Sequence, residues 1–149
     1  MKAIIVDIDG TLSDVDHRLH LIKDPQKKDY DKFYSKLGDD EPKGDIIELV
    51  NCLSKCYYTI LLTGRPNEYR KKTVDWLDKF GVHYDILFMR PTDDYRPDNV
   101  LKKEIYEERI KPHFEVLVVL DDRTRVVDMW REIGLTALQV DYWDDEEQG

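Results

Sequence analysis

The chain has 149 residues, enough for one domain with a full hydrophobic core. Its 32 acidic and 23 basic residues give a formal net charge of −9, which excludes a general attraction for polyanions or anionic membranes, so phosphate would have to bind at a local basic site or through a cation. No stretch approaches the roughly 20 apolar residues that span a bilayer.

The start, MKAIIVDIDG, contains the first predicted strand and reaches charged residues too early for a signal peptide, so we expect a cytoplasmic protein. Five apolar runs predict strands at residues 3–8, 58–64, 85–89, 115–122 and 136–140. Helical spacing of apolar residues predicts helices at 44–56, 67–81, 98–111 and 124–134. The runs lack polar alternation, which indicates a parallel sheet covered on both faces. Strand–helix alternation indicates one doubly wound (Rossmann-like) α/β domain over 1–149.

Residues 12–43 interrupt this alternation between the first strand and the predicted helix at 44–56. They contain a short predicted helix near YDKFYSKL and a turn at GDDEPKG. The segment is too short for a domain of its own, so we expect a small helical cap, or flap, over one edge of the sheet.

Two further segments are expected to carry no chemistry. Cys52 and Cys56 lie four apart in a predicted helix, and without two more zinc ligands nearby we expect reduced, structural thiols. The acidic end, DYWDDEEQG, is expected to be frayed.

Polar residues gather at the carboxyl ends of the predicted strands, where open α/β folds bind ligands. The motifs are DIDGT at 7–11, TGR at 63–65 and DDR at 121–123. Side chains two apart on a strand face the same way, so Asp7 and Asp9 can share a pocket, one as nucleophile and one as acid and base. Asp121 arrives from another strand and can share a cation with Asp7. An oxygen-only ligand set favours Mg²⁺.

Each of these residues also has a simpler interpretation. Asp9 can be a turn former, Asp122 a helix cap, Thr63 an ordinary strand residue and Lys102 a solvated helix lysine. The conjunction of all of them, in this order, is far more specific than any one.

That order resembles the haloacid dehalogenase (HAD) superfamily of phosphotransferases. The DxDGT motif stands at 7–11, the strand-end hydroxyl at Thr63, the lysine at Lys102 or Lys103, and the acidic pair at 121–122. The resemblance implies that Asp7 attacks phosphorus and becomes an aspartyl-phosphate, while Asp9 protonates the leaving oxygen and then deprotonates water. It implies that Thr63 and the lysine bind phosphate oxygens. The implied Mg²⁺ site comprises Asp7, the backbone carbonyl of Asp9, Asp121 and Asp122.

A narrower likeness covers residues 94–135, which resemble the 3′-phosphatase domain of phage-type polynucleotide kinase–phosphatases. It favours Lys102 as the motif lysine, because Lys102 lies four residues after Asp98 and shares its helix face. The implied substrate-binding set is Arg18, Thr63, Gly64, Arg65, Arg90, Arg96, Asp98 and Lys102. The alternative is that the arginines serve solubility and that Asp98 is only a helix N-cap.

Three functions are compatible with these motifs. The first is a Mg²⁺-dependent 3′-phosphatase acting on RNA or DNA ends. The second is a nucleotidase or another small-molecule phosphatase of the same superfamily. The third is a non-catalytic phosphate-binding or partner-binding module. The sequence contains no G-x-x-x-x-G-K-[ST] motif, so we expect no ATP-dependent kinase activity and a separate kinase or ligase partner in end repair.

Overall fold

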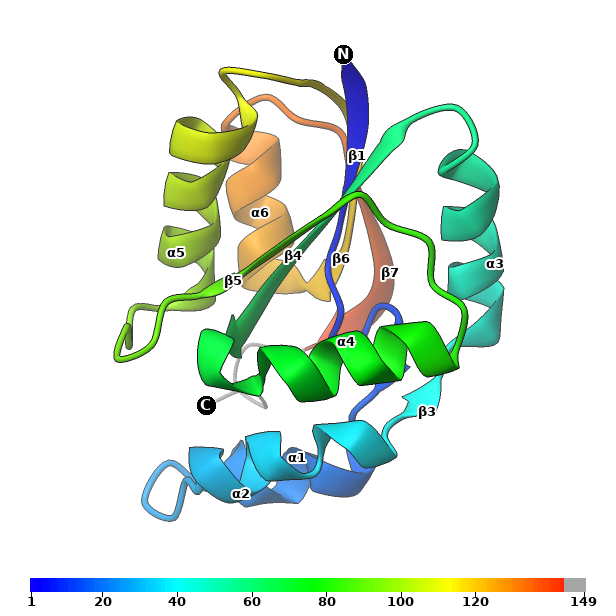
Figure 1. Ribbon diagram of the computed structural model, residues 1–149. Helices are drawn as coiled ribbons and strands as arrows, with labels where there is room; N and C mark the ends of the chain where they lie inside the picture. Colours follow the sequence, from blue (N-terminus) through cyan, green and yellow to red (C-terminus); the bar gives the residue numbers. More distant parts are fainter. Residues whose placement is uncertain (144–149) are drawn as a thin grey trace.

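The computed structural model describes residues 1–143 and contains a five-stranded, all-parallel sheet with helices on both faces (Figure 1). The strand order is β5-β4-β1-β6-β7. The strands are β1 (Lys2–Val6), β4 (Tyr58–Pro66), β5 (Ile86–Arg90), β6 (Glu115–Arg123) and β7 (Ala137–Trp143). This confirms the doubly wound fold. The chain builds outward from β1 in one direction through β4 and β5, then in the other through β6 and β7, so the topological switch lies between β1 and β6.

Helices cover both faces of the sheet (Figure 1). They are α3 (Gly44–Leu53), α4 (Arg70–Lys79), α5 (Asp98–Ile105) and α6 (Thr124–Glu132). Alternate residues of β1 serve the two faces: Ile4 and Val6 pack in the cluster with α3 and α4, whereas Ala3 and Ile5 pack in the cluster with α5 and α6. Burial on both faces explains why the strand sequences show no polar alternation. No helix within residues 1–143 has the length and apolar character to cross a membrane.

Several predicted bounds shift where the chain turns. Strand β1 ends at Val6 rather than at residue 8, because a tight turn follows in which three backbone N–H groups donate to the carbonyl of Ile8. Helix α3 ends at Leu53 rather than at residue 56. Cys52 and Cys56 are both free and both exposed. Strand β7 extends to Trp143 through part of the predicted frayed tail, and residues 144–149 of that tail lie outside the described residues.

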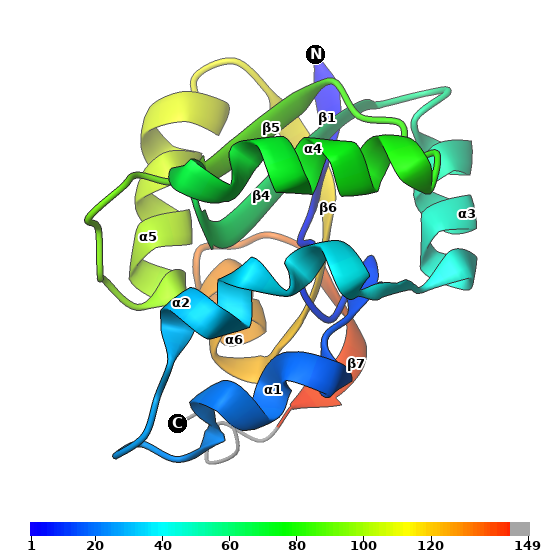
Figure 2. The same cartoon turned by 60° about the horizontal axis from the view of Figure 1, so that its bottom comes forward.

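The predicted cap is present as a small insert closed at its base by two short antiparallel strands, β2 (Ser13–Asp14) and β3 (Glu41–Pro42). Between them lie α1 (Asp16–Lys23), α2 (Tyr30–Ser35) and a 3₁₀ turn, η1 (Leu37–Asp39). The short helix expected near YDKFYSKL is α2, whereas α1 was not expected. Figure 2 shows α1 and α2 lying across the carboxyl ends of the strands.

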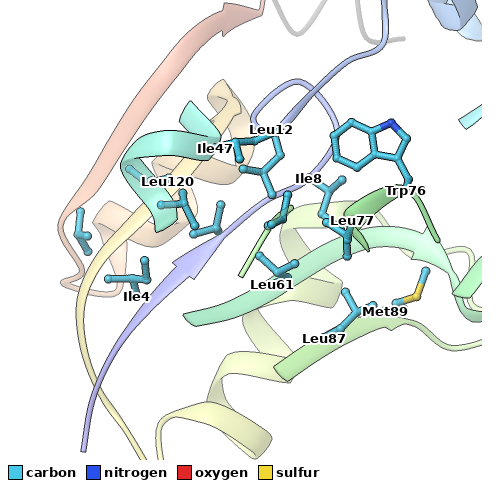
Figure 3. Packing of buried hydrophobic residues seen from close by; sticks show 14 residues of the cluster. Ile4, Ile8, Leu12, Ile47, Leu61, Trp76, Leu77, Leu87, Met89 and Leu120 are labelled. Carbon is cyan, nitrogen blue, oxygen red and sulfur yellow. The ribbon is translucent and has the colours of Figure 1, made fainter. Parts of the chain in front are cut away.

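The base of the cap is fixed to the core of the domain. Leu12, at the entrance to the insert, belongs to the same buried cluster as Ile8, Ile47 and Trp76 (Figure 3). The indole N–H of Trp76 donates to the backbone carbonyl of Asp40 at 2.9 Å. The packing of α4 therefore sets the position of the cap's returning strand.

Candidate active site

Three buried carboxylates meet at the topological switch point. Asp7 follows β1 directly, and Asp121 and Asp122 lie in the carboxyl-terminal part of β6. One carboxylate oxygen from each of the three lies within 4.8 Å of the others. Hard divalent cations such as Mg²⁺ prefer an all-oxygen donor set of this kind, so these residues fit the predicted metal. The carboxylate of Asp9 is not part of this cluster.

Lys102 inserts between two of these carboxylates from α5. Its Nζ lies 2.9 Å from Asp7 Oδ1 and 3.0 Å from Asp121 Oδ2, and the residue is 2% exposed. The neighbouring Lys103 is exposed. The structure therefore brings Lys102, and not Lys103, to the acids.

Burial and mutual repulsion perturb these acids. Burial and the Asp121 carboxylate raise the pKa of Asp7 to about 7, although Lys102 acts in the opposite direction. Burial and the charge of Asp7 likewise hold the pKa of Asp122 well above its ordinary value. Burial would lower the pKa of Lys102, but Asp121 and Asp7 outweigh it and raise that pKa. A cluster of this kind is stabilised by a bound cation, which offsets the repulsion.

Two glycines make room for carboxylates. Gly10 has φ +82°, and a Cβ there would lie 1.9 Å from Asp122 Oδ2. A Cβ on Gly64 would lie 2.5 Å from Asp98 Oδ1. Thr11, which belongs to the DIDGT motif but had no predicted role, donates its hydroxyl to Asp7 Oδ2 at 3.2 Å. Gly10 and Gly64 thus leave room for the carboxylates of Asp122 and Asp98, and Thr11 is hydrogen-bonded to Asp7.

Asp9 is held by two buried arginines. The Arg18 NH2 group lies 2.6 Å from Asp9 Oδ1, and the Arg65 NH2 and Nε groups lie 2.8 and 3.0 Å from the same oxygen. Burial alone would raise the pKa of Asp9, but Arg65 and Arg18 together hold that pKa far below its ordinary value. Asp7 and Asp9 line one cavity, although both residues lie beyond the end of β1.

Asp40 completes this arrangement and was missed, because GDDEPKG reads as an exposed turn. Its carboxylate accepts from Arg18 Nε at 2.7 Å, Arg18 NH2 at 2.8 Å and Arg65 NH2 at 3.3 Å, and it lies 2.6 Å from His17 Nε2. Arg18 also lies 4.2 Å from the ring centre of Phe33. Two arginines and two carboxylates thus form a buried, balanced quartet that joins the cap to β4.

Arg90, Arg96 and Asp98 form a second polar group. The carboxylate of Asp98 pairs with Arg90 and with Arg123, the latter at 2.9 Å, so it is not a simple N-cap. Arg90 Nε donates to the carbonyl of Gly64 at 2.8 Å. Arg96 pairs with the carboxylates of Asp94 and Glu104, and Thr63 Oγ1 accepts from the backbone N–H of Arg65 at 3.1 Å. Arg123 was not among the predicted substrate-binding residues.

A cavity of about 430 Å³ lies between the cap and the sheet. Most of the predicted site residues line it: Asp7, Asp9, Gly64, Arg90, Arg96, Asp98, Lys102, Asp121 and Asp122. Arg18, Thr63 and Arg65 are fully buried and are not part of the lining. Arg18 and Arg65 hold Asp9, which lines the cavity, whereas the Thr63 hydroxyl accepts from the backbone of Arg65.

Comparisons with known proteins agree with this geometry. The family model described as the polynucleotide kinase PNKP phosphatase domain matches residues 1–144. A protein of Autographa californica nuclear polyhedrosis virus, named as a bifunctional polynucleotide kinase/RNA ligase, is 30% identical over 140 residues, which are 92% of this chain and 19% of the viral protein. The chain therefore corresponds to only a part of that relative.

Among solved structures, a chain of a Pnkp1/Rnl/Hen1 complex is 41% identical, with a TM-score of 0.83, and the match covers 96% of this chain and 47% of that one. A haloacid dehalogenase-like hydrolase from Streptococcus pneumoniae shares the fold, with a TM-score of 0.63, 16% identity and coverage of 92% and 83% of the two chains. The chain thus belongs to the PNKP phosphatase-domain family of HAD-type phosphatases.

Proposed function

We propose that this chain is a Mg²⁺-dependent phosphomonoesterase that removes the 3′-phosphate from RNA or DNA ends through an aspartyl-phosphate. The observation that carries the proposal is the position of Asp7 at the switch point, flanked by Lys102 and two further buried acids and facing a cavity. The 3′-end substrate rests on the family and on the 41% identical relative, whose structure is described as an RNA repair complex.

The proposed chemistry has two displacements. An oxygen of Asp7 attacks phosphorus and forms the aspartyl-phosphate while the bond to the sugar oxygen breaks, and Asp9 gives that oxygen a proton. Water then attacks the same phosphorus, Asp9 takes its proton, and the bond to Asp7 breaks to release inorganic phosphate. Lys102, which lines the cavity, binds phosphate oxygens. Mg²⁺, held by Asp7, Asp121, Asp122 and the backbone carbonyl of Asp9, would neutralise phosphate charge.

The two arginines around Asp9 affect its proposed roles as general acid and general base. Arg18 and Arg65 stabilise the carboxylate form of Asp9, which is the form that accepts a proton from water. The acid step needs the protonated form. An incoming phosphate dianion raises the pKa of a nearby carboxyl by like-charge repulsion, so the substrate itself favours protonation of Asp9.

A nucleotidase is the second candidate, and the size of the cavity favours it. A volume of about 430 Å³ lies in the range of sites for single small molecules. The proposal extends to a cytoplasmic location, where exposed thiols such as Cys52 and Cys56 stay reduced, and to a separate kinase or ligase partner, as the names of the relatives suggest.

Turnover should be measured on a 3′-phosphorylated oligonucleotide, its 5′-phosphorylated counterpart and free nucleoside monophosphates. We expect kcat/KM for the 3′-phosphorylated end to exceed the others by at least about tenfold, or about 1.4 kcal/mol. A smaller preference would contradict the 3′-end assignment, and a preference for nucleoside monophosphates would support the nucleotidase.

A further inference from the structure

One wall of the cavity is aromatic. Tyr30 and Tyr34 from α2, together with Tyr69 from the 3₁₀ turn η2 (Asn67–Tyr69), line the same cavity as Asp7 and Lys102. The ring centres of Tyr30 and Tyr34 lie 6.1 Å apart with 24° between the planes, and those of Tyr34 and Tyr69 lie 5.4 Å apart with 33° between the planes. We call these three residues the tyrosine wall. It joins the cap to the body of the domain.

The wall differs from the aromatic residue that anchors the cap. Phe33 is buried and packs against the guanidinium of Arg18, which is a structural role. Tyr30 is 45% exposed and Tyr69 is partly exposed, so both rings keep surface that a ligand can contact. Packing of the cap alone does not require exposed aromatic rings on the lining of a cavity.

The wall also lies close to the proposed chemistry. Burial and the nearby carboxylates of Asp98 and Asp9 raise the pKa of the Tyr34 hydroxyl above its ordinary value, whereas Arg90 opposes this. Tyr34 lines the cavity together with Asp9 and Asp98. A group held on the wall would be a near neighbour of a phosphate placed at Asp7.

We propose that the tyrosine wall is a subsite for the nucleobase of the nucleotide that carries the phosphate to be removed. This deepens the proposed function and rests on it. Every base has a flat aromatic face, so stacking on tyrosine binds bases without selecting a sequence. A phosphate at Asp7 and a base on the wall would give two points of attachment to one nucleotide.

The test compares substrates that differ only in the base. One pair is an oligonucleotide ending in a 3′-phosphorylated nucleotide and the same oligonucleotide ending in a 3′-phosphorylated abasic residue. The other is a nucleoside 5′-monophosphate and ribose 5-phosphate. For the wild type we expect kcat/KM to be about tenfold higher for the base-bearing member, near the low end of the contribution of one base–aromatic stack. Because each variant is judged by its own ratio, a general loss of activity cancels.

The variants of Tyr34 distinguish the contribution of its ring to the ratio from that of its hydroxyl group. Tyr34→Leu should bring the ratio close to one, whereas Tyr34→Phe should keep it. Tyr30→Leu, at an exposed position that is safe for folding, should lower the ratio by about threefold even if Tyr34→Leu does not fold. Tyr142→Leu is the matched control, since Tyr142 is an exposed tyrosine of β7 away from the cavity lining, and it should retain the full ratio.

Two results would overturn the subsite: a ratio near one for both pairs in the wild type, or an unchanged ratio in both Tyr34→Leu and Tyr30→Leu. Failure of the 3′-end assignment looks different. In that case the 3′-phosphorylated end is not preferred by about tenfold over the other substrates, while the mononucleotide pair keeps a ratio that Tyr34→Leu or Tyr30→Leu lowers, and the nucleobase subsite stands.

Discussion

The replacement Asp40→Asn tests whether the buried quartet holds the cap to the body. Asp40 is 2% exposed, and its carboxylate accepts three hydrogen bonds from Arg18 and Arg65. Asparagine keeps the shape but loses the charge, so two buried guanidinium groups are left with one carboxylate, that of Asp9. Removing one partner from a buried ion pair costs about 3–5 kcal/mol. Because the amide oxygen still accepts a hydrogen bond, we take about 3 kcal/mol.

For a chain of this size, each 1 kcal/mol lowers Tm by about 2–4 °C, so Asp40→Asn should lower Tm by about 6–12 °C. Thermal unfolding followed by circular dichroism at neutral pH measures this. The matched control is Asp39→Asn, because Asp39 is the preceding residue and is exposed. Its free energy of unfolding should change by less than about 0.5 kcal/mol. Equal Tm values for the two variants would refute the reasoning.

Three further outcomes are expected. Asp7→Asn should abolish hydrolysis with an unchanged circular dichroism spectrum, because it removes the nucleophile; retained turnover would contradict this. Lys102→Met should lower kcat/KM by about 10²–10³, the cost of losing one preorganised group at the reacting phosphate, whereas Lys103→Met, at an exposed position, should stay within about twofold. Without metal, the free energy of unfolding should fall as pH rises from about 4 to about 7, because Asp7, whose pKa is raised from 3.8 to about 7, holds in the native state a proton that the unfolded chain has released. Adding Mg²⁺ at pH 7 should restore that stability. Urea unfolding at several pH values measures both effects. A rise in metal-free stability between about pH 4 and about pH 7 would contradict the raised pKa of Asp7.

Strand positions and strand-end motifs could be predicted because both follow from local patterns. A strand that is buried on both faces has a continuous run of apolar residues, as in AIIV before Asp7. The carboxyl ends of parallel strands meet at one edge, which places DIDGT beside the acidic pair of β6 before any side chain is seen. The bounds of β1 were overestimated because the apolar Ile8 continues the strand pattern although the turn has already begun.

The contents of the cap could not be predicted in the same way. Helix α1 has only a short apolar pattern, Leu19 and Ile22, and its buried residue is Arg18, so the sequence does not reveal it clearly. Asp40 lies 22 residues after Arg18 and meets it only through the folding of the insert. Its backbone carbonyl accepts from the indole N–H of Trp76, which lies on α4. Contacts of this kind depend on tertiary packing, which local sequence patterns do not encode.

Trapping of a phosphoryl group on Asp7 tests the central claim most directly. A 3′-phosphorylated oligonucleotide labelled with ³²P in the terminal phosphate is mixed with the enzyme and Mg²⁺, quenched in acid during turnover and analysed by peptide mass spectrometry. We expect label on the peptide that contains Asp7, dependent on Mg²⁺, absent in Asp7→Asn and absent when the label is placed in an internal phosphodiester. Rapid turnover with no labelled peptide at any quench time, or label on another residue, would contradict nucleophilic attack by Asp7.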